Sequence, residues 1–197
     1  MISVKELISK IRVRLRDESE GEFRFKDSEI LDALNSAYLD LNYQFKLNVK
    51  KYTKTISCED NILQTDKMFL SFEKGYLNNT PLNFKAYDEK AKLLQISSFS
   101  DFQSLIILPA RSANGTLEVF VNESVKLEMD SILKSGDFLE NALIFSVLIS
   151  IFQIESNEQN LQRVGFYENL YKKECDRLRA LISSAKEARS FQTYFNY

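Results

Sequence analysis

The sequence of 197 residues contains no histidine and no tryptophan. Histidine is the commonest general base in enzymes and supplies ligands to most catalytic zinc sites. Its absence argues against a catalytic nucleophile activated by histidine and against most zinc or iron centres. Cysteine is also rare. Cys58 and Cys175 lie far apart in unlike contexts, which fits neither a metal-binding spacing nor a disulfide framework and is typical of a reducing compartment. Because Cys175 falls on the apolar face of a predicted helix, we expect a buried thiol there, and we expect no metal and no cofactor.

Glycine and proline are scarce, with five and two residues. The glycines are too scattered to form a phosphate-binding loop, and no serine lies in a nucleophile-elbow motif. Carboxylates cluster at Asp17, Glu18, Glu20 and Glu22, but a carboxylate-based hydrolase needs a cleft that desolvates such groups. A solvated acidic turn is the simpler interpretation. We therefore predict that the chain is not an enzyme and keep a carboxylate-type hydrolase as an alternative.

Neither sign of charge dominates, because 26 basic residues face 28 acidic ones, for a net charge of −2 and a pI of about 5.4. No global positive field therefore attracts nucleic acid. Long apolar runs are also missing. The most apolar segment, 138–154, is interrupted by Glu140, Asn141 and Ser146, whereas a membrane span needs about 20 mostly apolar residues. We expect a buried helix there and no membrane contact.

Two helices are predicted near the N-terminus, over 3–16 and 28–46. Ser3 and Glu6 have the spacing of a capping box, and Asp27 is a candidate N-cap for the second helix. Apolar residues recur at helical spacing in both segments, which predicts a helical hairpin whose apolar faces meet.

The segment from about 49 to 130 instead shows short β-prone runs separated by turn residues. We predict two strands within 105–121, joined by a turn at Asn114-Gly115. Pro109 is expected to end the first strand, because proline has no backbone N–H to donate a hydrogen bond to a neighbouring strand. NNTP at 78–81 predicts another turn. The fold of 60–104 cannot be assigned from the sequence.

Helical patterns return at 138–154 and from about 157 to 185. The fold class that we predict is mainly α: a bundle of about four helices with a small antiparallel β module inserted between the two helical hairpins. Residues 1–185 are expected to form a single domain with the β insertion at about 49–130, followed by an aromatic C-terminal tail at 186–197.

Two groups of residues are candidates for binding. Lys5, Arg12 and Arg16 share one face of the first helix, where they could contact DNA phosphates or the acidic loop of a neighbouring copy, or simply face solvent. The tail contains four aromatic residues within seven positions, which is unusual for a disordered terminus. We predict that they bind a partner, with folding back onto the chain's own bundle as the alternative; they are Phe191, Tyr194, Phe195 and Tyr197.

The order of these segments resembles the head-to-tail connector, or adaptor, proteins of tailed bacteriophages and prophages. The resembling stretches are LISKIRVRLRD (7–17), RFKDSEILDALNSAYLDL (24–41), LIILPARSANGTLEVFV (105–121) and FLENALIFSVLISIF (138–152), followed by a long tyrosine-bearing helix. The chain departs from the family pattern at Ala110, where a second proline is typical.

The resemblance implies a structural virion-assembly protein that forms an oligomeric ring below the portal, extends the DNA channel and provides a place for the tail to attach. Its implied partners are the portal protein, tail or further connector proteins and other copies of itself, while DNA passes through without being bound specifically. Its implied location is the virion after assembly and the host cytoplasm during assembly.

Two other functions remain open at this point. The first is a nucleic-acid-binding regulator that uses the N-terminal helical hairpin as a helix-turn-helix, although the loop over 17–26 is long for that motif and the pI is low. The second is an interaction module of a secretion or tail-like machine, which differs from a connector mainly in its partner.

Overall fold

The computed structural model describes residues 1–17, 23–133, 136–154 and 158–194, with the backbone alone described at 136–137 and 186–194. Within these residues the chain is mixed α/β, with 46% helix and 27% strand, four helices and ten strands in three sheets. The prediction of a mainly α bundle with a small β module is therefore wrong. The chain forms two compact units, one from residues 1–38 and 126–197 and the other from residues 39–125.

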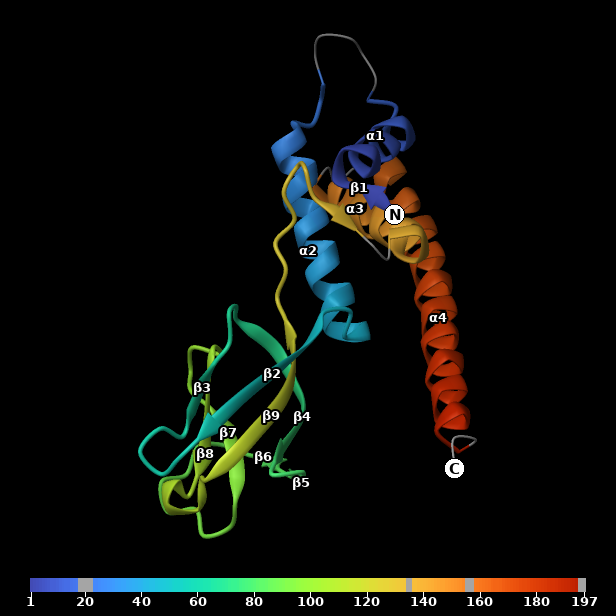
Figure 1. Cartoon of the computed structure of the whole chain (residues 1–197). Helices are drawn as coiled ribbons and strands as arrows, with labels where there is room; N and C mark the ends of the chain where they lie inside the picture. The colour runs from blue at the N-terminus through green and yellow to red at the C-terminus, as the bar shows by residue number, and fades with distance from the viewer. Residues whose placement is uncertain (18–22, 134–135, 155–157, 195–197) are drawn as a thin grey trace. The chain divides into compact units, whose positions relative to one another are not determined.

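The helical elements are shown in Figure 1; they are α1 (Val4–Leu15), α2 (Asp27–Phe45), α3 (Gly136–Ile154) and α4 (Glu158–Tyr194). The first unit also contains a short antiparallel pair formed by β1 (Ile2–Ser3) and β10 (Ile132–Leu133). The second unit begins within α2, at Leu39.

Helix α1 begins and ends as its sequence predicts. The Ser3 side chain accepts a hydrogen bond from the Glu6 backbone N–H at 3.1 Å, which confirms Ser3 as the N-cap. The helix stops at Arg16, which has a left-handed backbone (φ 56°) and whose N–H donates to carbonyls of the last turn. Its buried face consists of Val4, Leu7, Ile8 and Ile11, together with Arg12.

Helix α3 is the centre of the first unit. Its apolar residues are distributed all round the helix, as predicted, and it packs against both α1 and α4. Its fully or nearly buried residues are Leu139, Ala142, Leu143, Ile144, Val147, Leu148, Ile151 and Phe152.

Helix α4 buries a much narrower face, which includes Val164, Cys175 and Leu178. The expected burial of Cys175 is confirmed, and burial raises the pKa of its thiol. The α4 backbone continues to Tyr194 rather than ending near 185 as predicted.

The second unit consists of two four-stranded sheets that share one apolar core. The first sheet has the order β2-β9-β4-β5 and comprises β2 (Val49–Ile56), β9 (Gly115–Glu123), β4 (Phe69–Leu77) and β5 (Thr80–Pro81). The second has the order β3-β8-β7-β6 and comprises β3 (Ile62–Gln64), β8 (Ser104–Leu108), β7 (Gln95–Ser98) and β6 (Asn83–Phe84). Because β6 and β7 pair in parallel, the unit is not wholly antiparallel.

The predicted hairpin at 105–121 is also wrong, although both of its strands exist. β8 ends immediately before Pro109, as expected, but it pairs with β3 and β7, whereas β9 pairs with β2 and β4. The short 3₁₀ helix η1 (Ala110–Ser112) lies between the two strands in the sequence, so the connection leads from one sheet to the other.

Gly115 does not close a hairpin turn but begins β9 next to Asn78. Asn78 accepts a hydrogen bond from the Thr116 N–H at 2.9 Å and donates to the Asn114 carbonyl at 3.0 Å. A side chain at Gly115 would collide with Asn78, and Gly115 has φ 127°, a region that favours glycine. The tight turn lies instead between β4 and β5 at Asn78 and Asn79, where the motif NNTP predicted it.

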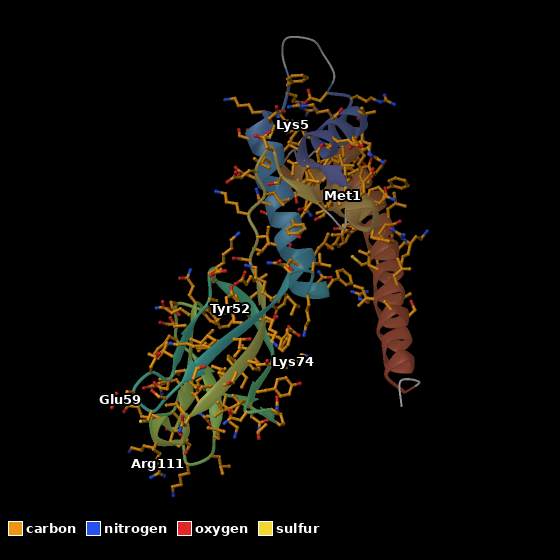
Figure 2. All side chains as sticks on the ribbon, in the orientation of Figure 1. Met1, Lys5, Tyr52, Glu59, Lys74 and Arg111 are labelled. Carbon is orange, nitrogen blue, oxygen red and sulfur yellow. The ribbon has the colours of Figure 1, made fainter. Side chains whose placement is uncertain are left out.

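A buried polar network joins the end of α2 to β2 and β9 within the second unit. The fully buried Glu123 carboxylate accepts a hydrogen bond from the Tyr52 hydroxyl and lies 3.1 Å from the Lys50 Nζ atom (Figure 2 labels Tyr52). The Asn42 amide donates to the Glu123 carbonyl at 2.7 Å. These contacts offset part of the cost of burying the carboxylate, although Glu123 Oε2 accepts no hydrogen bond among the described residues, and the interaction with Glu123 raises the pKa of Lys50.

Candidate interaction site

The basic residues that the sequence places on one face of α1 do not act together. Lys5 forms an exposed ion pair with Asp130 at 2.7 Å (Figure 2 labels Lys5), and this contact lowers the pKa of the Asp130 carboxyl. Arg12 is buried, whereas Arg16 is the exposed residue that ends the helix. The three residues therefore have three different surroundings.

Arg12 connects the end of α1 to the beginning of α2. Its guanidinium donates to Asp17 Oδ2 at 2.8 Å, to the Phe25 carbonyl at 2.9 Å and to the Asp27 carboxylate, and it lies 4.0 Å from the centre of the Phe23 ring. With only 8% of its surface exposed, Arg12 is occupied by contacts within its own chain.

These contacts also change the roles expected of the nearby carboxylates. Asp27 is paired with Arg12, and the residue that reaches back over the first turn of α2 is Glu29, whose carboxylate accepts a hydrogen bond from the Lys26 N–H at 2.7 Å. Asp17 is buried and also accepts a hydrogen bond from the Arg24 N–H at 2.8 Å. The other residues of the predicted acidic cluster, Glu18, Glu20 and Glu22, lie outside the described residues.

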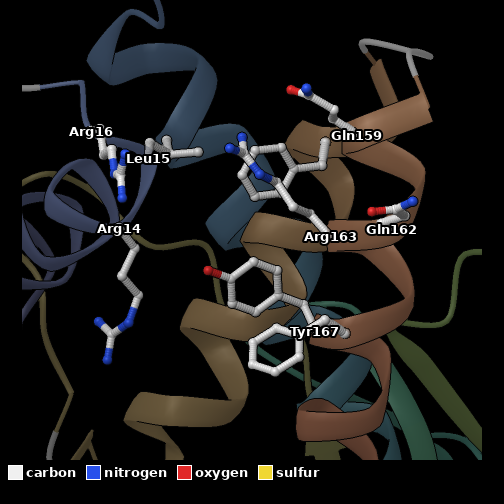
Figure 3. Close-up of a pocket in the computed structure, with 9 residues that line it drawn as sticks. Arg14, Leu15, Arg16, Gln159, Gln162, Arg163 and Tyr167 are labelled. Carbon is white, nitrogen blue, oxygen red and sulfur yellow. The ribbon is translucent and has the colours of Figure 1, made fainter.

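Three arginines of the first unit surround a cavity of about 550 Å³, which we call the arginine groove (Figure 3). Arg14 and Arg16 approach it from the end of α1, and Arg163 approaches it from the first turns of α4. The remaining lining residues are Leu15, Phe152, Gln159, Gln162, Phe166 and Tyr167.

No carboxylate among the described residues forms an ion pair with any of these three arginines. The Arg14 guanidinium donates to the Lys10 carbonyl at 3.5 Å, and Arg163 lies over the Phe152 ring at 5.3 Å. Lys10 itself is held by Glu140 at 2.9 Å and Glu6 at 3.1 Å. The groove therefore gathers three positively charged side chains although the chain as a whole is slightly acidic.

Aromatic side chains form the apolar part of the groove. The rings of Phe152 and Tyr167 stack with centroids 5.9 Å apart, and Phe166 meets Tyr167 edge-on at 5.4 Å. Phe166 nevertheless remains 59% exposed. Two further large apolar residues where α3 ends and α4 begins are exposed as well, Ile154 by 76% and Leu161 by 61%.

This combination of side chains is typical of the centre of a protein–protein interface. Arginine and large aromatic residues are enriched there, because both supply contact area and directed hydrogen bonds. The groove could equally accommodate phosphate groups, since arginine forks match carboxylate and phosphate geometry alike.

The sequence interpretation missed most of this groove. It named Arg16 among its candidate binding residues but did not single out Arg14 or Arg163. Arg14 and Arg163 lie far apart in the chain and line one cavity because α1 and α4 both pack against α3. The aromatic motif of the predicted tail cannot be located in the same way. The structure describes only the backbone at Phe191 and Tyr194, while Phe195 and Tyr197 lie outside the described residues.

Two other kinds of site were sought among the described residues. No group of three or more histidine, cysteine, aspartate or glutamate side chains is arranged to hold a metal ion there. In the same part of the chain, no helix has the length and apolar content needed to cross a membrane. Comparison with known proteins finds no matching family model and no curated protein of significant sequence similarity.

Proposed function

We propose that this chain is a structural subunit of a tailed bacteriophage or prophage particle, a head-to-tail connector that assembles into a ring below the portal. In this role it extends the DNA channel, binds the portal protein and provides the surface to which tail or further connector proteins attach. The proposal assigns it no catalytic activity and no cofactor.

The observation that carries this proposal is the arginine groove together with the exposed apolar residues beside it. Arg14, Arg16 and Arg163 lack carboxylate partners among the described residues, and Phe166 is largely exposed at the same place. Arginine and exposed aromatic side chains gathered at one place are typical of a surface that another protein covers. The order of sequence segments, which resembles that of the connector family, supplies the identity of the assembly.

The charge balance supports a channel role as well. Lys and Arg side chains neutralise phosphates and attract DNA, so a protein through which DNA must pass benefits from weak attraction. A net charge of −2 is compatible with that requirement.

A nucleic-acid-binding regulator is the second candidate, because the groove combines three arginines with Gln159, Gln162 and exposed aromatic rings. The hairpin version of this function is less well supported. Arg12, one of its three expected phosphate contacts, is buried and bonded within the chain.

Light scattering coupled to size-exclusion chromatography distinguishes the two functions, with the purified chain measured alone and then mixed with the portal protein encoded beside it. A connector is expected to give a discrete particle of many subunits that negative-stain microscopy shows as a ring. A compact monomer or dimer that ignores the portal protein but binds duplex DNA in a strongly salt-dependent manner would instead support the regulator. The neighbouring genes provide an independent check, since a connector gene is expected beside portal, capsid and terminase genes.

A further inference from the structure

Helix α2 has an acidic face that complements the arginine groove. Glu29, Asp32 and Asp40 are exposed and are separated by three and eight positions, with the exposed Ser36 between the two aspartates. These spacings place the residues along one side of an α-helix. Neither Asp32 nor Asp40 forms an ion pair with a basic residue in the described part of the chain.

The groove and the acidic face do not satisfy each other within one chain. None of the ion pairs among the described residues joins Arg14, Arg16 or Arg163 to an acid of α2. Among the described residues, every copy therefore has a basic surface and an acidic surface that do not pair with each other. A closed ring needs this arrangement, because each subunit contributes two different surfaces to its two neighbours.

We propose that the acidic face of α2 from one copy docks into the arginine groove of the next copy. This inference rests on the proposed function of a ring subunit and specifies its subunit contact. Arginine and carboxylate form paired, directional hydrogen bonds, and these become stronger where the neighbouring rings of Phe152, Phe166 and Tyr167 exclude water.

A phosphate backbone is the competing occupant of the groove. The second copy is favoured because each copy carries one acidic face of α2 for each arginine groove. The net negative charge of the chain also opposes general attraction to nucleic acid.

Two complementary charge reversals test the contact. The groove variant is Arg14→Glu with Arg163→Glu, and the face variant is Asp32→Lys with Asp40→Lys. All four residues are exposed, so both proteins are expected to fold with an unchanged circular dichroism spectrum and melting temperature. Each variant alone is expected to associate with itself at least about tenfold more weakly than the wild type, because like charges then face each other at every contact.

Mixing the two variants is expected to restore association. The acidic face of the groove variant can dock into the arginine groove of the face variant. At the next contact, the lysines on the face variant meet the glutamates in the groove of the groove variant, which is attractive as well. Sedimentation velocity of each protein and of the equimolar mixture measures this, alone and with the portal protein under the conditions in which the wild type assembles.

Control variants separate this contact from a general effect of charge. Lys172→Glu with Lys173→Glu changes the net charge of the chain by the same amount as the groove variant, at exposed positions of α4 outside the groove, and this variant is expected to assemble like the wild type. Glu59→Lys with Glu168→Lys is the matching acidic control.

The outcomes distinguish this inference from the proposed function. If the groove and face variants assemble as well as the wild type, or if mixing restores nothing, the inference is wrong while the ring itself stands. Loss of salt-dependent DNA binding in the groove variant, without loss of assembly, would assign the groove to nucleic acid instead. A wild-type chain that assembles neither alone nor on the portal protein would overturn both proposals.

Discussion

Three arginines follow one another at every second position near the end of α1, and each has a different role. Arg12 points into the first unit and holds the end of α1 to the start of α2. Arg14 is two positions further along, on the opposite side of the helix, and is exposed. Arg16 takes the left-handed conformation that ends the helix. A single helical turn thus separates a structural cation from two that are available for binding.

Replacing Arg12 by alanine is expected to reduce the free energy of unfolding by about 3–5 kcal/mol, because Asp17 then remains buried without its charged partner. Arg14→Ala is the matched control on the same helix and should change this free energy by less than about 0.5 kcal/mol. Urea denaturation followed by circular dichroism measures both. A loss below about 1 kcal/mol for Arg12→Ala would mean that its contacts do not hold the two helices together.

At the scale of elements, α3 and α4 differ in how much of their surface is buried. Helix α3 is apolar on all sides and is largely buried by its neighbours. Helix α4 extends over 37 residues but buries only a narrow face, so most of its surface faces outward. The stability of the first unit is therefore expected to depend mainly on α3, whereas most described side chains of α4 are exposed.

Phe145 and Phe152 test this division, since they lie seven residues apart on α3 and both contact the Tyr167 ring. Phe152→Ala is expected to cost roughly 3–5 kcal/mol of unfolding free energy because Phe152 is buried. Phe145→Ala should cost less, because Phe145 is only half-buried. Phe138→Ala, at a position on the same helix that is 57% exposed, is the control. A change below about 1 kcal/mol for Phe152→Ala in a denaturant melt would assign this face to a partner interface.

At the scale of the whole molecule, the chain folds into two units that each have an apolar core of their own. The first unit is built from both ends of the chain, and the second is the continuous segment 39–125. The C-terminal end of α4 lies beyond Leu178, the last nearly fully buried side chain among the described residues.

Deletion of residues 188–197 is expected to leave the melting temperature unchanged within about 2 °C, because the tail is predicted to bind a partner rather than to pack on its own chain. The shortened chain should nevertheless fail to join the ring or the portal protein, since it lacks the four aromatic residues predicted to bind a partner. Differential scanning calorimetry and light scattering measure the two effects. A protein that melts several degrees lower and still assembles would show that the tail packs on its own chain.

Local rules were sufficient wherever a feature depends on neighbouring residues. Ser3 caps α1, Pro109 follows the end of β8, and the apolar pattern of 138–154 corresponds to a buried helix. Each feature depends on residues a few positions apart: a capping side chain, a proline that cannot donate a backbone hydrogen bond to a neighbouring strand, and helical periodicity. The same rules could not choose partners. Asn114-Gly115 is typical of a hairpin turn, yet β8 and β9 belong to different sheets. When the chain crosses from one sheet to the other, the apolar side chains of both strands are buried in the core that the two sheets share.

The sequence by itself determined where the helices and several strands lie, the burial of Cys175 and the slight excess of negative charge. Only the tertiary structure decided that the β segment is a two-sheet unit with its own core, that Arg12 is bonded internally, and that Arg14 and Arg163 line one groove. The physical reason is distance along the chain. Periodicity and capping act within one or two helical turns, whereas strand pairing and charge pairing depend on which distant segments meet when apolar surface is buried.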